Sequence, residues 1–139
     1  MEFKDKEKLY RRVQHTLQQA GLIIVEGLHD QRALEELGVV TPILKANAKP
    51  ERVAQQALTL LGETSQQPVL LLFDFDLEGE RKLRDYREAL ATTGLHCDAQ
   101  TRRQIRLLTG ITHVEDLPRP WHELEQQLAR GSAGRVTIR

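Results

Sequence analysis

Hydrophobic positions along the chain follow two alternating patterns, one typical of helices and one typical of buried strands. Within residues 4–20, Leu9, Val13 and Leu17 recur every four positions, which predicts an amphipathic helix. The next segment, 22–25, is an unbroken run of apolar residues, a pattern typical of a strand that is covered on both faces. The chain is therefore expected to begin with a helix followed by a buried strand.

The alternation continues toward the C-terminus. Apolar residues spaced three and four apart predict further helices, and short apolar runs predict further strands. In chain order these are a helix at 30–37, a strand at 39–44, a helix at 50–61, a strand at 69–73, a helix from Glu80 to a cap at Gly94, a short strand at 95–97, a helical turn or two at 102–108 and a last helix at 121–129. This order favours an α/β fold, with a parallel sheet of about four strands and helices on both faces.

The 139 residues form one expected domain over 1–139, because no linker divides them. Its parts are a helix at 4–20, a core at about 22–117 and a helical tail at 118–139. A single cysteine, Cys97, excludes an internal disulfide and fits a reducing compartment. The longest apolar run is too short to span a membrane, and the charged N-terminus does not resemble a signal peptide. We therefore expect a cytoplasmic protein without a membrane partner.

Acidic residues follow two of the predicted strands. Glu26 comes after the first strand, and Asp74, Asp76 and Glu78 come at alternate positions after the third. The carboxyl ends of parallel strands meet at one edge of a sheet, where carboxylates repel one another unless a cation such as Mg²⁺, or Mn²⁺ in its place, lies among them. The alternative is that these acids cap the following helix, an interpretation that fits Asp30 equally well for the helix beside it.

The acidic segments resemble the two signature motifs of the Toprim domain. These segments read IVEGLHD at 24–30 and DFDLEGE at 74–80. The domain occurs in type IA topoisomerases, bacterial-type primases, old-family nucleases and ribosomal-RNA maturation nucleases. The chain is most similar to small stand-alone Toprim proteins of prokaryotes, which share Ala-Leu at 33–34, Leu-Gly at 37–38 and Val-Glu-Asp-Leu at 114–117. The resemblance thus covers most of the predicted core.

The Toprim resemblance implies a role for each acid. Glu26 would be the general acid or base, Asp74 and Asp76 would hold Mg²⁺, and Glu78 would assist at a metal site that includes Glu26. The glycines of the two motifs, such as Gly79, would let the backbone approach the ion or a phosphate. The implied activity is cleavage of nucleic-acid phosphodiesters by a nuclease or RNA-processing enzyme. The alternative is a non-catalytic module that uses Mg²⁺ to bind nucleic acid or a protein partner.

The accessory parts of larger Toprim enzymes are not recognisable in this sequence. Tyr10 and Tyr86 lie on predicted amphipathic helices, one cysteine cannot supply a primase zinc module, and no phosphate-binding Gly-Lys-Ser/Thr loop occurs. A phosphate-accepting aspartate of the dehalogenase kind would need Ser or Thr where Glu78 stands. The five histidines are interpreted as surface or packing residues, except for His29, which lies between two acids of the first motif.

Charge is balanced overall but unevenly distributed. There are 9 basic and 13 acidic residues up to Glu80, and 11 basic and 7 acidic residues after it. Neutral total charge argues against binding of nucleic acid by bulk electrostatics, although a local basic surface is compatible with it. The predicted nucleic-acid-binding residues are Arg81, Arg84, Arg87, Arg102, Arg103 and Arg106. The first three share one helix face and Lys82 points elsewhere; the alternative is that this face is merely solvated.

Overall fold

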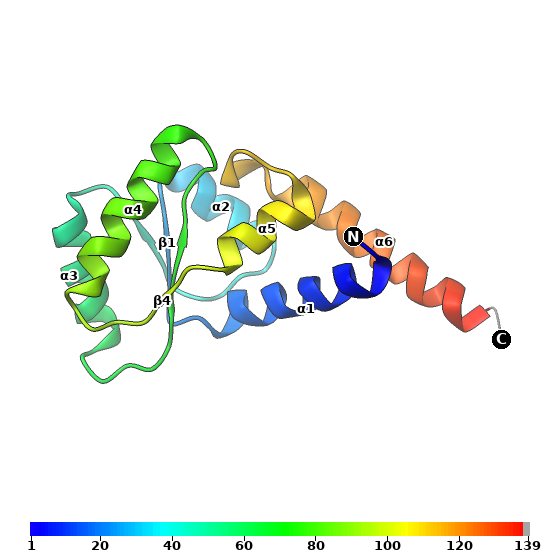
Figure 1. Cartoon of the computed structure of the whole chain (residues 1–139), viewed down its shortest axis with the longest axis horizontal. Coiled ribbons are helices and arrows are strands. Elements are labelled where there is room, and N and C mark those ends of the chain that lie inside the picture. Colours follow the sequence, from blue (N-terminus) through cyan, green and yellow to red (C-terminus); the bar gives the residue numbers. More distant parts are fainter. Residues whose placement is uncertain (138–139) are drawn as a thin grey trace.

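A four-stranded, all-parallel sheet with helices on both faces forms the framework of the protein (Figure 1). The computed structural model describes residues 1–137 and the side chains of residues 1–131. Its helices are α1 (Phe3–Gln19), α2 (Leu28–Glu36), α3 (Pro50–Leu61), α4 (Leu77–Ala91), α5 (Thr101–Thr109) and α6 (Pro118–Thr137), with a 3₁₀ turn at Val114–Asp116. Its strands are β1 (Leu22–Val25), β2 (Ile43–Lys45), β3 (Val69–Leu72) and β4 (Cys97–Asp98). The predicted fold class is confirmed.

The two central strands, β1 and β3, end side by side. The sheet order is β2-β1-β3-β4, and β1 pairs with β3 in parallel from Leu22 opposite Val69 to Val25 opposite Leu72. All eight residues of these two strands are buried, as expected for strands covered on both faces. The residues that follow the two strands therefore emerge together at the carboxyl edge of the sheet.

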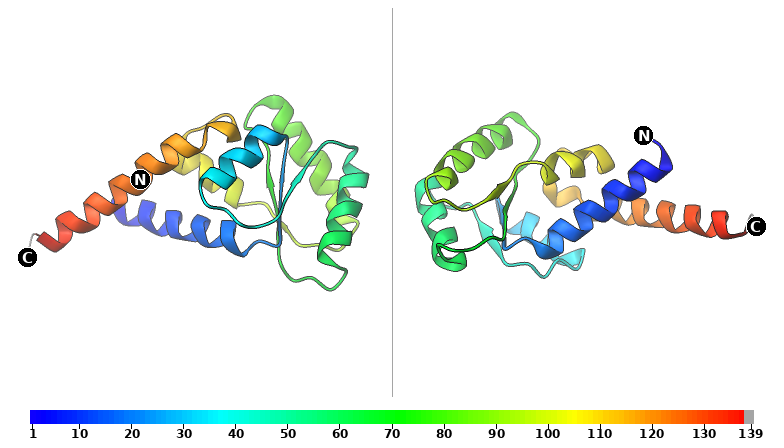
Figure 2. Two further views of the ribbon diagram at one scale, coloured as in Figure 1. Left: turned by 180° about the vertical axis from the view of Figure 1, so that it is seen from behind. Right: turned by 60° about the horizontal axis from the view of Figure 1, so that its bottom comes forward.

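Alternate residues of the central strands point into two separate cores. On one face, Ile23 and Leu70 pack in a core that draws its other members largely from α1, α5 and α6. On the other face, Ile24 and Leu71 pack against α3 and α4. Figures 1 and 2 show α3 and α4 on one side of the sheet and α1 and α5 on the other, with the outer part of α6 extending away from it. Close packing on both faces holds the central strands in place, and with them the carboxyl edge of the sheet.

The second strand begins later than the sequence pattern predicts. A strand was expected at 39–44, whereas β2 comprises Ile43–Lys45. The preceding residues turn toward α1, because the Thr41 hydroxyl donates a hydrogen bond of 2.7 Å to the Leu17 carbonyl. Apolar character alone does not distinguish such a turn from a strand. The fourth strand is likewise displaced, from the predicted 95–97 to Cys97–Asp98.

The last helix is longer than the segment 121–129 that apolar spacing predicts. It begins at Pro118 and runs to Thr137, which matches the expected helical tail except for residues 138–139, which lie outside the described part of the chain. Proline suits the first turn of a helix because its missing N–H group has no partner to lose there. Within the described residues, no helix is both long and apolar enough to cross a membrane.

Candidate metal centre

The predicted acidic site lies at the carboxyl edge of β1 and β3. Glu26 follows β1 directly, and Asp74 lies two residues beyond the end of β3. One carboxylate oxygen of Glu26, Oε2, accepts a hydrogen bond of 2.7 Å from the backbone N–H of Asp74. The structure thus joins the two motifs across 48 residues of sequence, as the strand pattern predicts.

The Asp74 carboxylate lies against the segment that connects α5 to the 3₁₀ turn. Its Oδ1 accepts a hydrogen bond of 2.8 Å from the Val114 N–H, and its Oδ2 lies 3.3 Å from Nδ1 of His113. The loop between β3 and α4, residues 73–76, is called the β3 loop. The Phe75 N–H of this loop donates a hydrogen bond of 2.7 Å to the Thr112 carbonyl of the connecting segment. His113 is consequently held beside the acids, and its hydrogen bond to Asp74 raises the pKa of the imidazole.

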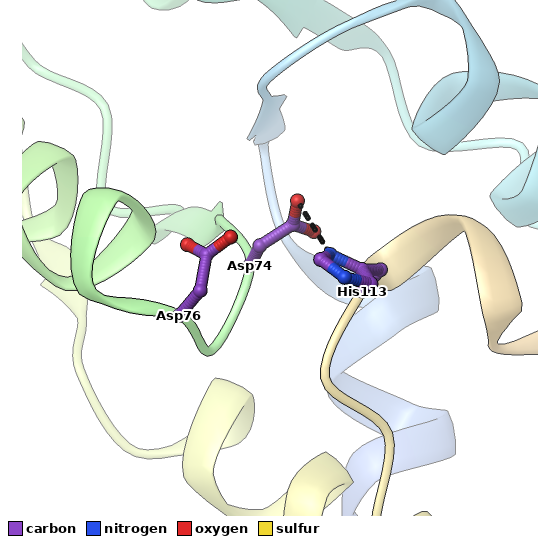
Figure 3. A group of neighbouring side chains, drawn as sticks. All are labelled: Asp74, Asp76 and His113. Carbon is purple, nitrogen blue, oxygen red and sulfur yellow. Dashed lines mark hydrogen bonds and ion pairs between the residues drawn. The ribbon is translucent and has the colours of Figure 1, made fainter.

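Asp76 occupies the N-cap position of α4. Its Oδ1 accepts a hydrogen bond of 2.7 Å from the Gly79 N–H, so the capping interpretation applies to this residue. The Asp74 carboxylate, by contrast, does not cap α4: it interacts with the Val114 N–H and with Nδ1 of His113. Asp74, Asp76 and His113 each offer one donor atom, and these atoms lie within 4.8 Å of one another (Figure 3). Among the described residues, these three form the group that could hold a metal ion.

Glu26 is held by an ion pair that the sequence pattern does not indicate. Nζ of Lys82 lies 3.0 Å from Oε1 of Glu26, and this hydrogen bond raises the pKa of the lysine. Glu78 is largely exposed, with one oxygen 4.0 Å from the same Nζ. The predicted metal set is therefore only partly brought together: in the described part of the chain, Glu26 adjoins Asp74 but neither Glu26 nor Glu78 belongs to the three-residue group.

Arg102 differs from the other arginines predicted to bind nucleic acid, because its guanidinium group is buried against the loop that follows β3. The side chain is buried, and Nε donates a hydrogen bond of 2.8 Å to the Phe73 carbonyl. Nη2 donates to the Asp74 carbonyl and lies 3.2 Å from Oε1 of Glu80. The guanidinium carbon also lies 4.3 Å from the centre of the Phe75 ring. Because these contacts use most of its donors, Arg102 is less suited to bind nucleic acid than the exposed arginines, and its binding role stays a prediction.

The other arginines predicted to bind nucleic acid lie at the surface. They are Arg81, Arg84, Arg87, Arg103 and Arg106. The first three extend along α4 from a point next to the metal group, whereas Lys82 of the same helix contacts Glu26, so the predicted separation of Lys82 from the arginines is confirmed. Binding of nucleic acid by the exposed arginines stays a prediction.

Gly79 lies in close contact with the backbone of Asp74. A Cβ atom at this position would lie 1.9 Å from the carbonyl oxygen of Asp74. The glycine thus lets the first turn of α4 pack directly on the backbone of the loop that follows β3. The glycine is therefore needed for contact between two protein segments, and the approach of its backbone to an ion or phosphate stays a prediction.

Asp30 is a buried acid close to the site. Its Oδ2 accepts a hydrogen bond of 3.1 Å from the backbone N–H of Gly27, the N-cap residue of α2, which confirms a role at the start of this helix. Burial, with a smaller contribution from the negative charge of Asp74, raises the pKa of Asp30 to about 6. Asp30 is therefore harder to ionise in the folded protein than in the unfolded chain, and its negative charge at neutral pH destabilises the fold.

We expect Asp30→Asn to stabilise the protein at neutral pH. The raised pKa means that the native state binds this proton more tightly than the unfolded chain, so the free energy of unfolding falls as the pH rises from about 4 to about 6. Asparagine keeps an oxygen acceptor for the Gly27 N–H and carries no charge. The expected gain is about 2 kcal/mol at pH 7.5, declining toward zero near pH 4.

Urea unfolding at several pH values measures this gain. Asp85→Asn, which removes a more exposed carboxylate on α4, serves as the control and should produce a small effect that varies little with pH. An equal response of the two variants to pH would contradict the assignment of the effect to Asp30.

Two residues of the centre, His113 and Lys82, could not be recognised from the sequence. His113 immediately precedes the Val-Glu-Asp-Leu segment at 114–117, which is the one local signal of its position. Its contact with Asp74 spans 39 residues, and the contact of Lys82 with Glu26 spans 56. Such separations are set by how the elements pack, and helical spacing does not encode them.

The fold and this centre define an α/β protein with an acidic, histidine-containing group at the ends of two parallel strands. No family model matches the chain. It is 38% identical over 104 residues to a UPF0292 protein of Thermococcus sibiricus, covering 70% of this chain and 75% of that protein. It is 31% identical over 121 residues to a UPF0292 protein of Pyrococcus furiosus, covering 85% of this chain and 87% of that protein. The chain belongs to the UPF0292 family.

A solved structure shares the fold. The chain is similar to a putative protein from Aquifex aeolicus with a TM-score of 0.63 and 24% sequence identity, and the match covers 79% of this chain and 95% of the other. At this level of identity, the likeness concerns the architecture alone.

Proposed function

We propose that this protein is a Toprim-type, metal-dependent enzyme that cleaves nucleic-acid phosphodiesters, as a nuclease or an RNA-processing enzyme. The observation that supports this proposal is the meeting of Asp74, Asp76 and His113 at the carboxyl ends of β1 and β3, with Glu26 hydrogen-bonded to the backbone of Asp74. Positioned carboxylates and a divalent ion are the groups that phosphoryl transfer needs.

The donor set fits a divalent cation. Asp74 is only partly buried and Asp76 is exposed, so both carboxylates can reach an ion that also keeps waters and a substrate phosphate. Carboxylate oxygens suit Mg²⁺ and Mn²⁺, and a bound divalent ion would stabilise the charge that develops on phosphate oxygens. The Val114 N–H and the Asp76–Gly79 hydrogen bond orient the two acids before any ion binds.

Glu26 is the residue that we assign to proton transfer. Lys82 and the Asp74 N–H each bind one of its oxygens and thereby orient the carboxylate next to Asp74. A carboxylate in this place can accept a proton from an attacking hydroxyl group or water, or return one to the leaving oxygen. Lys82, which contacts the same carboxylate, places a positive charge beside the acids.

Cleavage of labelled DNA and RNA in the presence of Mg²⁺ or Mn²⁺ tests this proposal. We expect the wild-type protein to cleave at least one substrate class, and Glu26→Gln to reduce the rate by about 100-fold or more because the proton acceptor is lost. Glu63→Gln, in the exposed loop after α3, is the matched control and should retain the wild-type rate. Undiminished cleavage by Glu26→Gln would contradict the assigned role.

The engagement of both Glu26 oxygens favours a second candidate function, a non-catalytic module that binds nucleic acid with the help of the metal ion. A carboxylate that is bound to a lysine and a backbone amide can serve to hold the metal loop in shape. Under this hypothesis the wild-type protein binds the same substrates without cleaving them, and Glu26→Gln leaves binding unaltered. The cleavage assay therefore separates the two candidates.

The exposed arginines of α4 supply a further prediction. Because Arg81 and Arg84 follow Asp76 on α4, with Arg84 about 12 Å along the helix axis, we expect them to contact the phosphates of a bound nucleic acid. Replacing both with alanine should weaken binding about tenfold at low salt and reduce the slope of log affinity against log salt by about 2. Fluorescence anisotropy at several salt concentrations measures both quantities.

A charge-matched control identifies the binding surface. Lys4→Ala with Lys8→Ala removes two exposed positive charges from α1 and should change the affinity and the salt slope much less. Wild-type affinity and slope in the α4 double variant would show that the arginine face is only solvated.

A further inference from the structure

The imidazole of His113 makes the donor set of the centre unlike one built from carboxylates alone. Asp74 lies between Asp76 and His113 in Figure 3, and the three donor atoms come from two segments that meet only in the folded protein. The Val114 N–H donates a hydrogen bond to the Asp74 carboxylate, and the Thr112 carbonyl accepts one from the Phe75 N–H. His113, between these two anchored residues, is therefore held in place by the backbone on either side.

The spacing of His113 and Asp74 suits two ligands of one ion. Nδ1 of His113 lies 3.3 Å from Oδ2 of Asp74. Two donor atoms that are each about 2.1 Å from an ion lie about 3.0 Å apart at a right angle and about 3.4 Å apart at a tetrahedral angle. Because the other Asp74 oxygen accepts the Val114 N–H, Oδ2 is the atom directed toward His113. An ion would replace the present hydrogen bond with two ligand bonds.

Imidazole nitrogen changes which metal ions such a site favours. Mg²⁺ is a hard ion that prefers oxygen ligands, whereas first-row transition ions bind imidazole and carboxylate together. We propose that His113 is a direct metal ligand and that it makes the centre bind a first-row transition ion in preference to Mg²⁺. This inference rests on the proposed function of the same centre and concerns which ion that centre selects.

Titration with Mn²⁺ and Mg²⁺, followed by electron paramagnetic resonance of the Mn²⁺ complex, tests the inference without measuring activity. We expect wild-type protein to bind Mn²⁺ about tenfold or more tightly than Mg²⁺, with a nitrogen coupling from the imidazole in the Mn²⁺ spectrum. His113→Ala should lose the nitrogen coupling and bind Mn²⁺ about 10- to 100-fold more weakly, with a smaller effect on Mg²⁺. His113→Asn, which offers an oxygen near the position of Nδ1, should reduce the preference for Mn²⁺.

The chain provides a matched control in a second histidine–carboxylate pair. Nδ1 of His122 also lies 3.3 Å from a carboxylate oxygen, that of Glu125, but on α6 and outside the metal group. His122→Ala should leave the coupling and both affinities unchanged. A Mn²⁺ complex without nitrogen coupling, or a coupling that survives in His113→Ala, would overturn the inference while leaving the carboxylate site intact. Metal affinity that is unchanged in Asp74→Asn with Asp76→Asn would instead overturn the proposed function.

Discussion

Replacing Gly79 with alanine should lower the free energy of unfolding by about 3 kcal/mol or more. The added Cβ atom would lie 1.9 Å from the Asp74 carbonyl oxygen and within 2.6 Å of the carbonyl carbon. Both obstructing atoms belong to the backbone, so rotation of a side chain cannot relieve the overlap. The first turn of α4 must move away from the β3 loop, which would also break the hydrogen bond from the Gly79 N–H to Asp76. Urea unfolding followed by circular dichroism measures the loss.

The glycine of the first motif is the matched control. Gly27 has extended backbone geometry, and a Cβ atom there would meet no atom within 4 Å. Gly27→Ala should therefore cost less than about 1 kcal/mol, which is the usual range for replacing an N-cap glycine. Equal stability losses in the two variants would show that the tight contact with Asp74 does not determine the cost at position 79.

Arg102→Leu should be the second strongly destabilising change, at about 3 kcal/mol. Leucine retains an apolar stem for the surrounding core but removes the donors that bind the carbonyls of Phe73 and Asp74. It also removes the ion pair with Glu80 and the stacking of the guanidinium group on Phe75. Thermal and urea unfolding of the variant measure the effect. Because the same contacts fix the loop after β3 that carries Asp74 and Asp76, metal affinity should fall as well.

Two further variants separate geometry from charge. Arg102→Lys retains the charge, but one ammonium group cannot reproduce the fork of donors, so it should recover less than half of the loss. Arg103→Leu, at the exposed neighbouring position, should alter stability by no more than about 0.5 kcal/mol. Wild-type stability of Arg102→Leu would contradict the view that this arginine supports the loop.

Much of the fold could be predicted because its central strands have a distinctive sequence. The runs at 22–25 and 69–73 are apolar throughout, and they became the adjacent buried strands β1 and β3. The edge strand β2 was misplaced because residues 39–42 are apolar enough to resemble a strand while Thr41 ties them to α1. At the edge of a sheet, tertiary contacts determine where strand pairing begins, and the local sequence pattern does not contain information about these contacts.

The acids of the site could be predicted because each follows a recognisable strand. The residues that surround them could not, since His113 and Lys82 reach the acids only through the packing of distant elements. Arg102 shows a related gap: helical spacing places it on α5, but spacing does not tell which face of α5 is buried against the β3 loop. The sequence therefore indicates where carboxylates gather, and the structure shows which of them lie close enough together to bind one metal ion.

Calorimetric titration of divalent metal ions, with and without a short nucleic acid, tests the central claim most directly. We expect Asp74→Asn with Asp76→Asn to abolish the wild-type binding, because these two carboxylates belong to the one three-residue metal group of the described chain. Asp5→Asn with Asp85→Asn, which removes the same charge from α1 and from a later turn of α4, should bind metal as the wild type does. Unchanged metal affinity in the Asp74 and Asp76 double variant would contradict the account.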